Sequence, residues 1–242
     1  MSENIIVSLD NISMTYHQRE GETDALRNIS FDVAEGDFIG IVGPSGCGKT
    51  TILSLIAGLI KPTAGTVYVE GKPVDGPSTK VGYMLQQDHL FEWRTILQNV
   101  MLGLEIQGKV SDETKTMAEK LLDNYGLGEF KNHYPHQLSG GMRQRVALIR
   151  TLALNPKILL LDEPFSALDY QTRLAVSVEV ADIIKKERKT ALLVTHDISE
   201  AISMSNKVIV LTKRPARIKS IYDINLTCDE HNPISCRQAP EF

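Results

Sequence analysis

The sequence predicts an α/β fold built around a mainly parallel sheet. Short runs rich in β-branched and aliphatic residues recur along the 242-residue chain, and helical patterns separate them. Several of these runs are continuously apolar, as expected of parallel strands that helices bury on both faces. Such an alternation of strands and helices is typical of α/β proteins. The composition, with 42% hydrophobic and 23% charged residues, excludes intrinsic disorder, a collagen-like fibre and a disulfide scaffold.

The expected elements follow from these patterns in chain order. We expect strands at residues 5–9, 29–33, 38–42, 66–69, 81–85, 158–161, 191–194, 208–211 and 217–222. We expect helices at residues 49–57, 96–102, 114–125, 140–154, 170–189 and 198–203. Residues 88–155 show helices and turns but no convincing strand, which indicates a helical subdomain inserted into the α/β core. We therefore expect one domain over residues 1–226 and a loose polar tail over residues 227–242.

Net charge and hydropathy limit the classes of partner and the cell compartment that we expect for this chain. A net charge of −4 argues against nucleic-acid backbone as the main partner. The first residues lack the basic and apolar segments of a signal peptide. No apolar run approaches the ~20 residues needed to cross a bilayer. We therefore expect a cytoplasmic chain that reaches a membrane only through a partner.

A glycine-rich loop follows the expected strand 38–42 and leads directly into a helix that continues with Thr51. The loop consists of Gly43, Pro44, Ser45, Gly46, Cys47, Gly48, Lys49 and Thr50. Glycines let successive backbone N–H groups turn inward around a polyphosphate, and the helix N-terminus adds further N–H groups and a partial positive charge. The lysine supplies a full charge for the β- and γ-phosphates, and the threonine hydroxyl can bind Mg²⁺. The loop predicts binding of a nucleoside triphosphate, with Cys47 as a small side chain at a variable position.

Two acids end the apolar strand 158–161. Burial of a carboxylate is costly unless a cation or hydrogen bonds compensate it, so Asp162 is the candidate Mg²⁺ ligand. Glu163, one residue further, can orient and deprotonate an attacking water. An acidic cap after a strand is the alternative explanation, and it suits Glu163 better than Asp162.

A second glycine motif opens the expected helix 140–154. Ser139, Gly140 and Gly141 place a hydroxyl, N–H groups and the positive end of a helix together, which makes a second anion site. Taken alone, a serine N-cap followed by loop glycines explains the same residues.

In their order, these motifs resemble the ATP-binding cassette (ABC) family, the nucleotide-binding subunits of ABC transporters, over nearly the whole chain. Further matches are Tyr16 in segment 13–16, Gln86 in 83–87, Pro164, the segment 166–169 that ends in Asp169, and His196 in 194–197. The resemblance implies a P-loop NTPase (RecA-like) core with an N-terminal antiparallel β part. It also implies an ATPase that uses ATP and Mg²⁺.

The resemblance implies a role for each matched residue. Tyr16 would stack on adenine, and Gln86 would contact Mg²⁺ or the attacking water, with Gln87 as the alternative. His196 would contact the γ-phosphate and would act in catalysis with Glu163, Gln86 and Lys49. Two cassettes would dimerise head to tail, so that Ser139, Gly140 and Gly141 of one subunit close over ATP held by the other. Asp169 would help to join the two subunits.

The segment 86–95 resembles one importer branch, which serves nitrate, sulfonate, taurine, bicarbonate and thiamine precursors, although Glu92 stands where proline often precedes the tryptophan, here Trp93. The resemblance implies import of a small anion, sulfonate or vitamin precursor. The implied partners are a second ATP-binding subunit in a homodimer, transmembrane permease subunits and, indirectly, an extracytoplasmic solute-binding protein. The chain would lie peripherally on the cytoplasmic side of the cell membrane. Trp93 would pack at the surface that receives the permease or, alternatively, anchor a core.

Other functions remain open at this point. The main alternative is a soluble ABC ATPase that acts on DNA repair or translation machinery. The chain has a short segment between the phosphate loop and Ser139 and carries one cassette, whereas those proteins have long coiled coils or two cassettes. A P-loop kinase would lack the Ser139 motif and would need an acceptor site, for which we find no candidate residues.

Overall fold

The computed structural model describes residues 4–18, 21–227 and 233–242 and forms an α/β fold with two sheets. The strands are β1 Ile5–Gln18, β2 Gly21–Ala34, β3 Phe38–Val42, β4 Ala64–Val69, β5 Lys72–Pro73, β6 Val81–Met84, β7 Ile158–Asp162, β8 Thr190–Val194, β9 Lys207–Leu211 and β10 Ile218–Asp223. The α-helices are α1 Lys49–Ile56, α2 Ile96–Ile106, α3 Asp112–Asn124, α4 Gly140–Leu152, α5 Tyr170–Lys186, α6 Ile198–Met204 and α7 Pro233–Cys236, with 3-10 turns at Gly128–Phe130 and Pro135–Gln137.

The central sheet has the order β10-β9-β3-β8-β7-β6, and all neighbours except β10 and β9 are parallel. Every residue of β7 and β8 is buried. Their side chains alternate between two cores: Leu160 packs with α1 and the antiparallel sheet, whereas Leu159 and Leu161 pack with α4 and α5. Burial on both faces explains why these strands are apolar without interruption and confirms the predicted mainly parallel sheet. The carboxyl ends of β3, β7 and β8 therefore meet at one edge.

The second sheet is antiparallel, with the order β2-β1-β4-β5. The sequence predicted strands only at 5–9 and 29–33, but β1 and β2 are each 14 residues long and form a hairpin. The pairing shifts register between Leu9 and Ile12, and Asn11 there has a φ of 52°. An irregularity of this kind breaks the two-residue alternation of inward and outward side chains, which is why the rest of each strand was missed.

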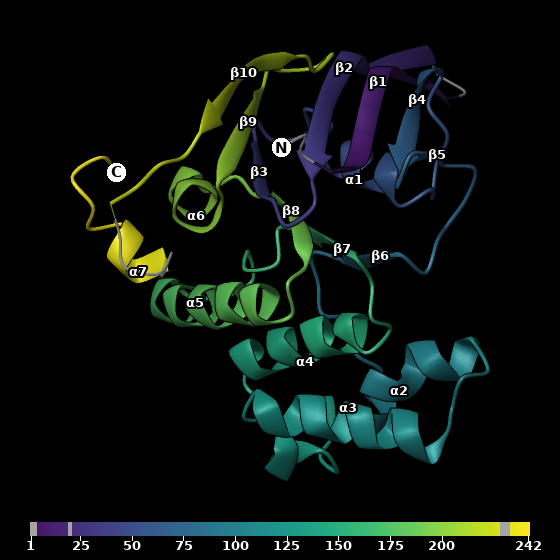
Figure 1. Cartoon of the computed structure of the whole chain (residues 1–242), viewed down its shortest axis with the longest axis vertical. Helices are drawn as coiled ribbons and strands as arrows, with labels where there is room; N and C mark the ends of the chain where they lie inside the picture. The colour runs from purple at the N-terminus through teal and green to yellow at the C-terminus, as the bar shows by residue number, and fades with distance from the viewer. Residues whose placement is uncertain (1–3, 19–20, 228–232) are drawn as a thin grey trace.

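Helices α2, α3 and α4 form the end of the molecule opposite the antiparallel sheet (Figure 1). They share a core with Val100, Leu122 and Ile149 at its centre. Asn99 on α2 is fully buried and holds the loop before the helix: its Oδ1 accepts from the Phe91 N–H at 2.8 Å. Its Nδ2 lies 3.0–3.1 Å from the carbonyls of Phe91, Arg94 and Thr95. This single side chain ties the 91–95 loop to the helical region.

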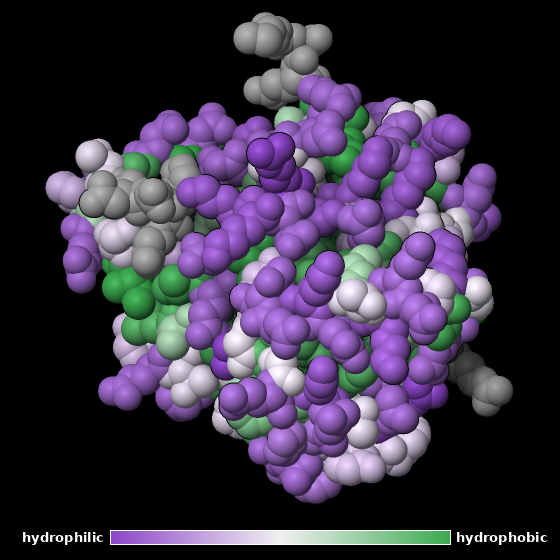
Figure 2. Space-filling model, turned by 60° about the horizontal axis from the view of Figure 1, so that its bottom comes forward, coloured by the Kyte–Doolittle hydropathy of each residue, from purple (hydrophilic) through white to green (hydrophobic). Residues whose placement is uncertain are grey.

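The surface and the C-terminal segment differ in part from the sequence expectations. The helical end of the molecule presents a mostly hydrophilic surface (Figure 2), and Trp93 is 73% exposed, so the core-anchor alternative for this residue is wrong. Pro233 and Cys236 of α7 are buried, and α7 packs on α5 and α6. This part of the expected loose tail is therefore docked, while residues 228–232 lie outside the described chain. Among the described residues, no helix has both the length and the apolar character that spanning a membrane requires.

The role of Asn99 can be tested by Asn99→Ala. We expect the free energy of unfolding to fall by about 1–3 kcal/mol, because a buried N–H and several carbonyls lose their partner. Gln98→Ala, which removes an exposed capping contact to Thr95, serves as the control and should cost about 0.5–1 kcal/mol. Urea denaturation measures both values. Equal small losses in the two variants would contradict the bracing role of Asn99.

Candidate functional site

The glycine-rich loop wraps around the Lys49 side chain at the end of β3. Lys49 is only 5% exposed, and its Nζ donates to the carbonyls of Gly43 at 2.8 Å and Pro44 at 3.1 Å. Gly48 has a φ of 122°, and a Cβ there would lie 2.7 Å from Leu26 Cδ2, so only glycine fits. Helix α1 begins at Lys49 without a capping side chain and without an acid in its first turn. A concentrated positive potential and unpaired N–H groups therefore face the loop.

Two other residues shape this loop, and one of them was not predicted. Cys47 is buried in the core beside Gly43, and its backbone N–H donates to the Pro44 carbonyl at 3.2 Å, so its thiol is part of the packing. Arg214 donates from Nε and Nη2 to the Gly46 carbonyl, at 3.1 and 2.6 Å. Arg214 follows β9, which lies beside β3 in the sheet. Only this strand order brings Arg214 to the loop, and strand order was not part of the sequence prediction.

Asp162, at the end of β7, lies beside the first turn of α1. It is 5% exposed, its Oδ1 accepts from the Thr50 hydroxyl at 3.1 Å, and its Oδ2 accepts from the Tyr83 hydroxyl at 3.2 Å. Burial raises the pKa of Asp162 above its usual range, although both hydrogen bonds and the Lys49 charge oppose this shift. Burial and the adjacent Asp162 charge raise the pKa of Tyr83 as well. A nearby divalent cation would favour the ionised carboxylate, as a metal ligand requires. Sequence reasoning gave Tyr83 no role.

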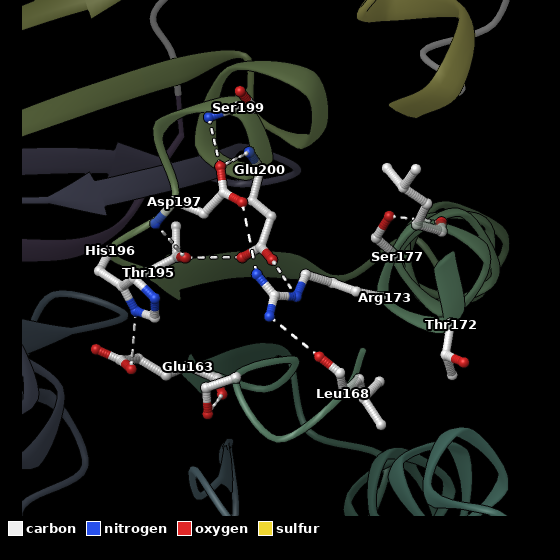
Figure 3. Close-up of polar contacts among 12 residues, drawn as sticks. Glu163, Leu168, Thr172, Arg173, Ser177, Thr195, His196, Asp197, Ser199 and Glu200 are labelled. Carbon is white, nitrogen blue, oxygen red and sulfur yellow. Dashed lines mark hydrogen bonds and ion pairs between the residues drawn. The ribbon is translucent and has the colours of Figure 1, made fainter. Parts of the chain in front are cut away.

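Glu163 sits at the sheet edge with His196 and Gln86 around it. Its φ is 45°, an unfavourable conformation for a residue with a Cβ, and its N–H donates to the Val194 carbonyl at 2.8 Å. Its Oε2 lies 3.1 Å from His196 Nδ1 (Figure 3) and 3.5 Å from Gln86 Nε2. Gln86, and not Gln87, therefore reaches the acid. The structure brings together residues that three different strands carry: β6, β7 and β8.

Of the remaining predicted residues, Tyr16 lies beside the phosphate loop helix α1, whereas Ser139, Gly140 and Gly141 lie at the start of α4. Tyr16 on β1 lies at the start of α1, where its hydroxyl is 3.2 Å from the Thr51 Oγ1. The exposed Ser139 is the N-cap of α4 and accepts from the Met142 N–H at 3.3 Å. A Cβ on Gly141 would lie 2.8 Å from Val176 of α5, so this glycine permits close packing of α4 on α5. Within the described chain, no hydrogen bond joins the residues 139–141 to the phosphate loop.

Asp169 is the N-cap of α5, and its Oδ1 accepts from the Thr172 N–H at 3.1 Å. The hydrogen bonds from Thr172 lower the pKa of its exposed carboxyl, which keeps Asp169 ionised. Ser139 thus caps α4 and Asp169 caps α5, and these two helices pack against each other. Both residues are exposed, and within the described chain neither has a hydrogen bond to the buried Lys49.

Comparison with known proteins identifies the arrangement. The family model described as ABC transporter matches residues 26–166. The chain is 41% identical over 240 residues to the nitrate import ATP-binding protein NrtD of Synechocystis sp., which covers 98% of this chain and 90% of that protein. It is also 41% identical over 217 residues to the taurine import ATP-binding protein TauB of Ruegeria pomeroyi, which covers 89% of this chain and 81% of that protein.

Solved structures agree with this match. The dimeric post-hydrolysis state of the ATP-binding cassette MJ0796, bound to ADP and Pi, has a TM-score of 0.78 and 35% sequence identity, and covers 91% of this chain and 99% of that chain. The predicted P-loop NTPase fold and the predicted family are therefore confirmed. This chain belongs to the ABC transporter family, as one of its ATP-hydrolysing ATP-binding subunits.

Proposed function

We propose that this subunit drives solute import and that it completes its ATP site only when a second ATP-binding subunit adds the Ser139 motif in trans. The observation that carries this proposal is the separation of the two anion sites. The phosphate loop holds the buried Lys49, while Ser139 caps an exposed helix start that has no hydrogen bond to that loop within the described chain. The Ser139 motif is an anion site without a lysine of its own, which suits it to complete the ATP site of a second subunit.

ATP would be bound mainly by the loop that encloses Lys49. The ammonium now donates to the carbonyls of Gly43 and Pro44, and it can exchange these partners for the oxygens of the β- and γ-phosphates. The uncapped N–H groups of α1 contribute further donors. The half-buried ring of Tyr16 beside Thr51 offers the adenine a flat surface on which to stack.

The residues around Asp162 fit Mg²⁺. Asp162 is a buried carboxylate, Thr50 donates its hydroxyl to it, and Gln86 carries an amide oxygen within reach of the same edge. These are the oxygen ligands that Mg²⁺ prefers. When bound, Mg²⁺ would neutralise charge on the phosphates. The raised pKa of Asp162 supports the fit, because a cation at this place offsets the cost of burying its charge.

Glu163 would orient the attacking water and accept its proton. Its backbone conformation and its contacts with His196 and Gln86 hold the carboxylate at the sheet edge, next to the phosphate loop. His196 would contact the γ-phosphate, so that one imidazole touches both the base and the transferred group. In the dimer, Ser139, Gly140 and Gly141 would close over ATP bound to the other subunit, and Asp169 would join the two subunits.

The transport role rests on the family and on the names of the relatives. NrtD is named for nitrate import and TauB for taurine import, and both support import of a small anion or sulfonate; a vitamin precursor is a further candidate from the branch resemblance. The partners would be transmembrane permease subunits, with an extracytoplasmic solute-binding protein acting indirectly, on the cytoplasmic side of the membrane. The rings of Phe91 and the exposed Trp93 are tilted against each other, with their centroids 4.8 Å apart, and would contact the permease. Copurification with DNA or ribosomes instead of a permease would favour the soluble alternative.

Lys49→Ala tests the phosphate loop. The variant loses the only buried ammonium of the loop, so we expect ATP to bind about 10- to 100-fold more weakly, as for a lost hydrogen bond from a charged group. Titration with a fluorescent ATP analogue measures the affinity. Lys72→Ala, at an exposed lysine of β5, should leave the affinity unchanged. Wild-type affinity in Lys49→Ala would refute the assignment.

Glu163→Gln separates ATP binding from hydrolysis. The amide cannot accept a proton, so we expect the rate of hydrolysis to fall by about 10²- to 10⁴-fold while ATP still binds. The unhydrolysed nucleotide should hold two subunits together, and gel filtration with ATP should show a dimer. Glu129→Gln makes the same chemical change at an exposed position and should behave as wild type. A monomer in the presence of saturating ATP would count against the proposal.

Ser139→Arg tests completion in trans. A long charged side chain would fill the exposed anion site, so we expect turnover to be lost while the isolated subunit binds ATP with normal affinity. Ser111 caps α3 in the same way as Ser139 caps α4, so Ser111→Arg controls for loss of the cap and should retain turnover. If Ser139→Arg weakens ATP binding to the monomer, the motif acts within its own chain.

A further inference from the structure

A cluster of charged side chains lies beside His196 and Glu163, between the start of α5 and the start of α6 (Figure 3). Arg173, in the first turn of α5, is at its centre. Its Nη1 lies 3.7 Å from Asp197 Oδ2, and its Nε lies 3.8 Å from Glu200 Oε1. Its Nη2 donates to the Leu168 carbonyl at 3.1 Å. One guanidinium therefore makes three contacts, which join two backbone segments: the start of α6 and the turn before α5.

Hydrogen bonds of Glu200 and Asp197 fix the two residues that flank His196 in the sequence, Thr195 and Asp197 itself. Glu200 Oε2 accepts from the Thr195 hydroxyl at 2.7 Å, and the Asp197 N–H donates to the same Thr195 oxygen at 3.0 Å. Asp197 Oδ1 also caps α6, with the N–H groups of Ser199 and Glu200 as donors. The backbone on each side of His196 is thus fixed. The imidazole itself points away from the cluster to Glu163 (Figure 3).

The third contact reaches the other loop of the site. Leu168 directly precedes Asp169, and its N–H donates to the Phe165 carbonyl in a turn that overlaps the turn from Glu163 to Ser166. A hydrogen bond from Arg173 to the Leu168 carbonyl therefore fixes one end of the segment that begins with Glu163 and ends with Asp169. Arg173 ties this segment to the loop that carries His196, through Asp197 and Glu200.

Burial makes the cluster sensitive to loss of a charge. The Glu200 side chain is 4% exposed, and burial raises its pKa, as does the Asp197 charge. Arg173 and Arg237, which follows α7, act in the opposite direction. Since Arg237 remains beside Glu200 when Arg173 is replaced, part of the charge compensation persists and the chain should still fold.

We propose that Arg173 is a positioning residue for ATP hydrolysis, which sets the distance between Glu163 and His196 by holding their two loops to one guanidinium. This inference rests on the proposed roles of Glu163 and His196. A displacement of about 1 Å in such an arrangement is enough to cost roughly a hundredfold in rate. In this proposal Arg173 acts through these residues and would not touch ATP itself.

The test compares Arg173→Gln with a matched arginine. Arg145 on α4 has the same side-chain exposure, 22%, and an ion pair to Glu179 at 3.2 Å, but contacts neither loop. We expect Arg173→Gln to lower kcat roughly 10- to 100-fold with ATP binding to the monomer unchanged. Arg145→Gln should lose similar thermal stability and keep its kcat. Equal kcat values in the two variants would overturn the proposal.

A double variant separates positioning from packing. In a His196→Ala background, Arg173→Gln should lower the single-turnover rate by no more than about twofold, because the group that it positions is gone. A full additional loss would mean that Arg173 acts independently of His196 and would contradict the inference. If His196→Ala alone leaves hydrolysis intact, the proposed role of His196 fails instead. If Arg173→Gln does not fold, Arg173→Lys decides: a single ammonium lacks the guanidinium fork and cannot make all three contacts, and an unchanged kcat would refute the proposal.

Discussion

The site depends on two opposite charges buried at one edge of the parallel sheet. Lys49 and Asp162 are each only 5% exposed, at the ends of β3 and β7. Neither charge is stable in the interior without compensation, and the loop carbonyls, Thr50 and Tyr83 supply it in part. In the proposed function, ATP and Mg²⁺ would supply the rest, since they offer negative charge to the lysine and positive charge to the carboxylate. In this proposal, relief of the free-energy cost of burying Lys49 and Asp162 would contribute to the affinity for ATP and Mg²⁺.

Around this charged pair lie the groups that we propose act on the terminal phosphate, and further away lie the exposed helix starts that we propose face a second subunit. Glu163 adopts a backbone conformation that is unfavourable for any residue but glycine, and the Val194 carbonyl, His196 and Gln86 hold it there. Ser139 and Asp169 instead cap two helices that open toward solvent. In the proposed dimer, the buried residues of one subunit would bind ATP and the exposed helix starts of the other would close over it, so that ATP would link the two subunits.

Features that depend on residues close together in the sequence could be predicted, whereas features that depend on the order of the strands in the sheet could not. The strands around Leu160 and Leu193 were predictable because burial on both faces makes them apolar throughout, and the phosphate loop because its chemistry is contiguous in sequence. The hairpin of β1 and β2 was underestimated because the irregularity at Asn11 breaks the alternation. Tyr83 and Arg214 reach the site only because β6 lies beside β7 and β9 beside β3.

Mixing two inactive subunits tests whether a second chain completes the ATP site. Lys49→Ala lacks a working phosphate loop, and Ser139→Arg lacks a working helix tip, so neither homodimer contains an intact site. A mixed dimer pairs the intact loop of one chain with the intact tip of the other. The account predicts that ATPase activity appears on mixing, although each variant alone is inactive. If the mixture stays inactive while the two chains are shown to form mixed dimers, the site is completed within a single chain and the account is wrong.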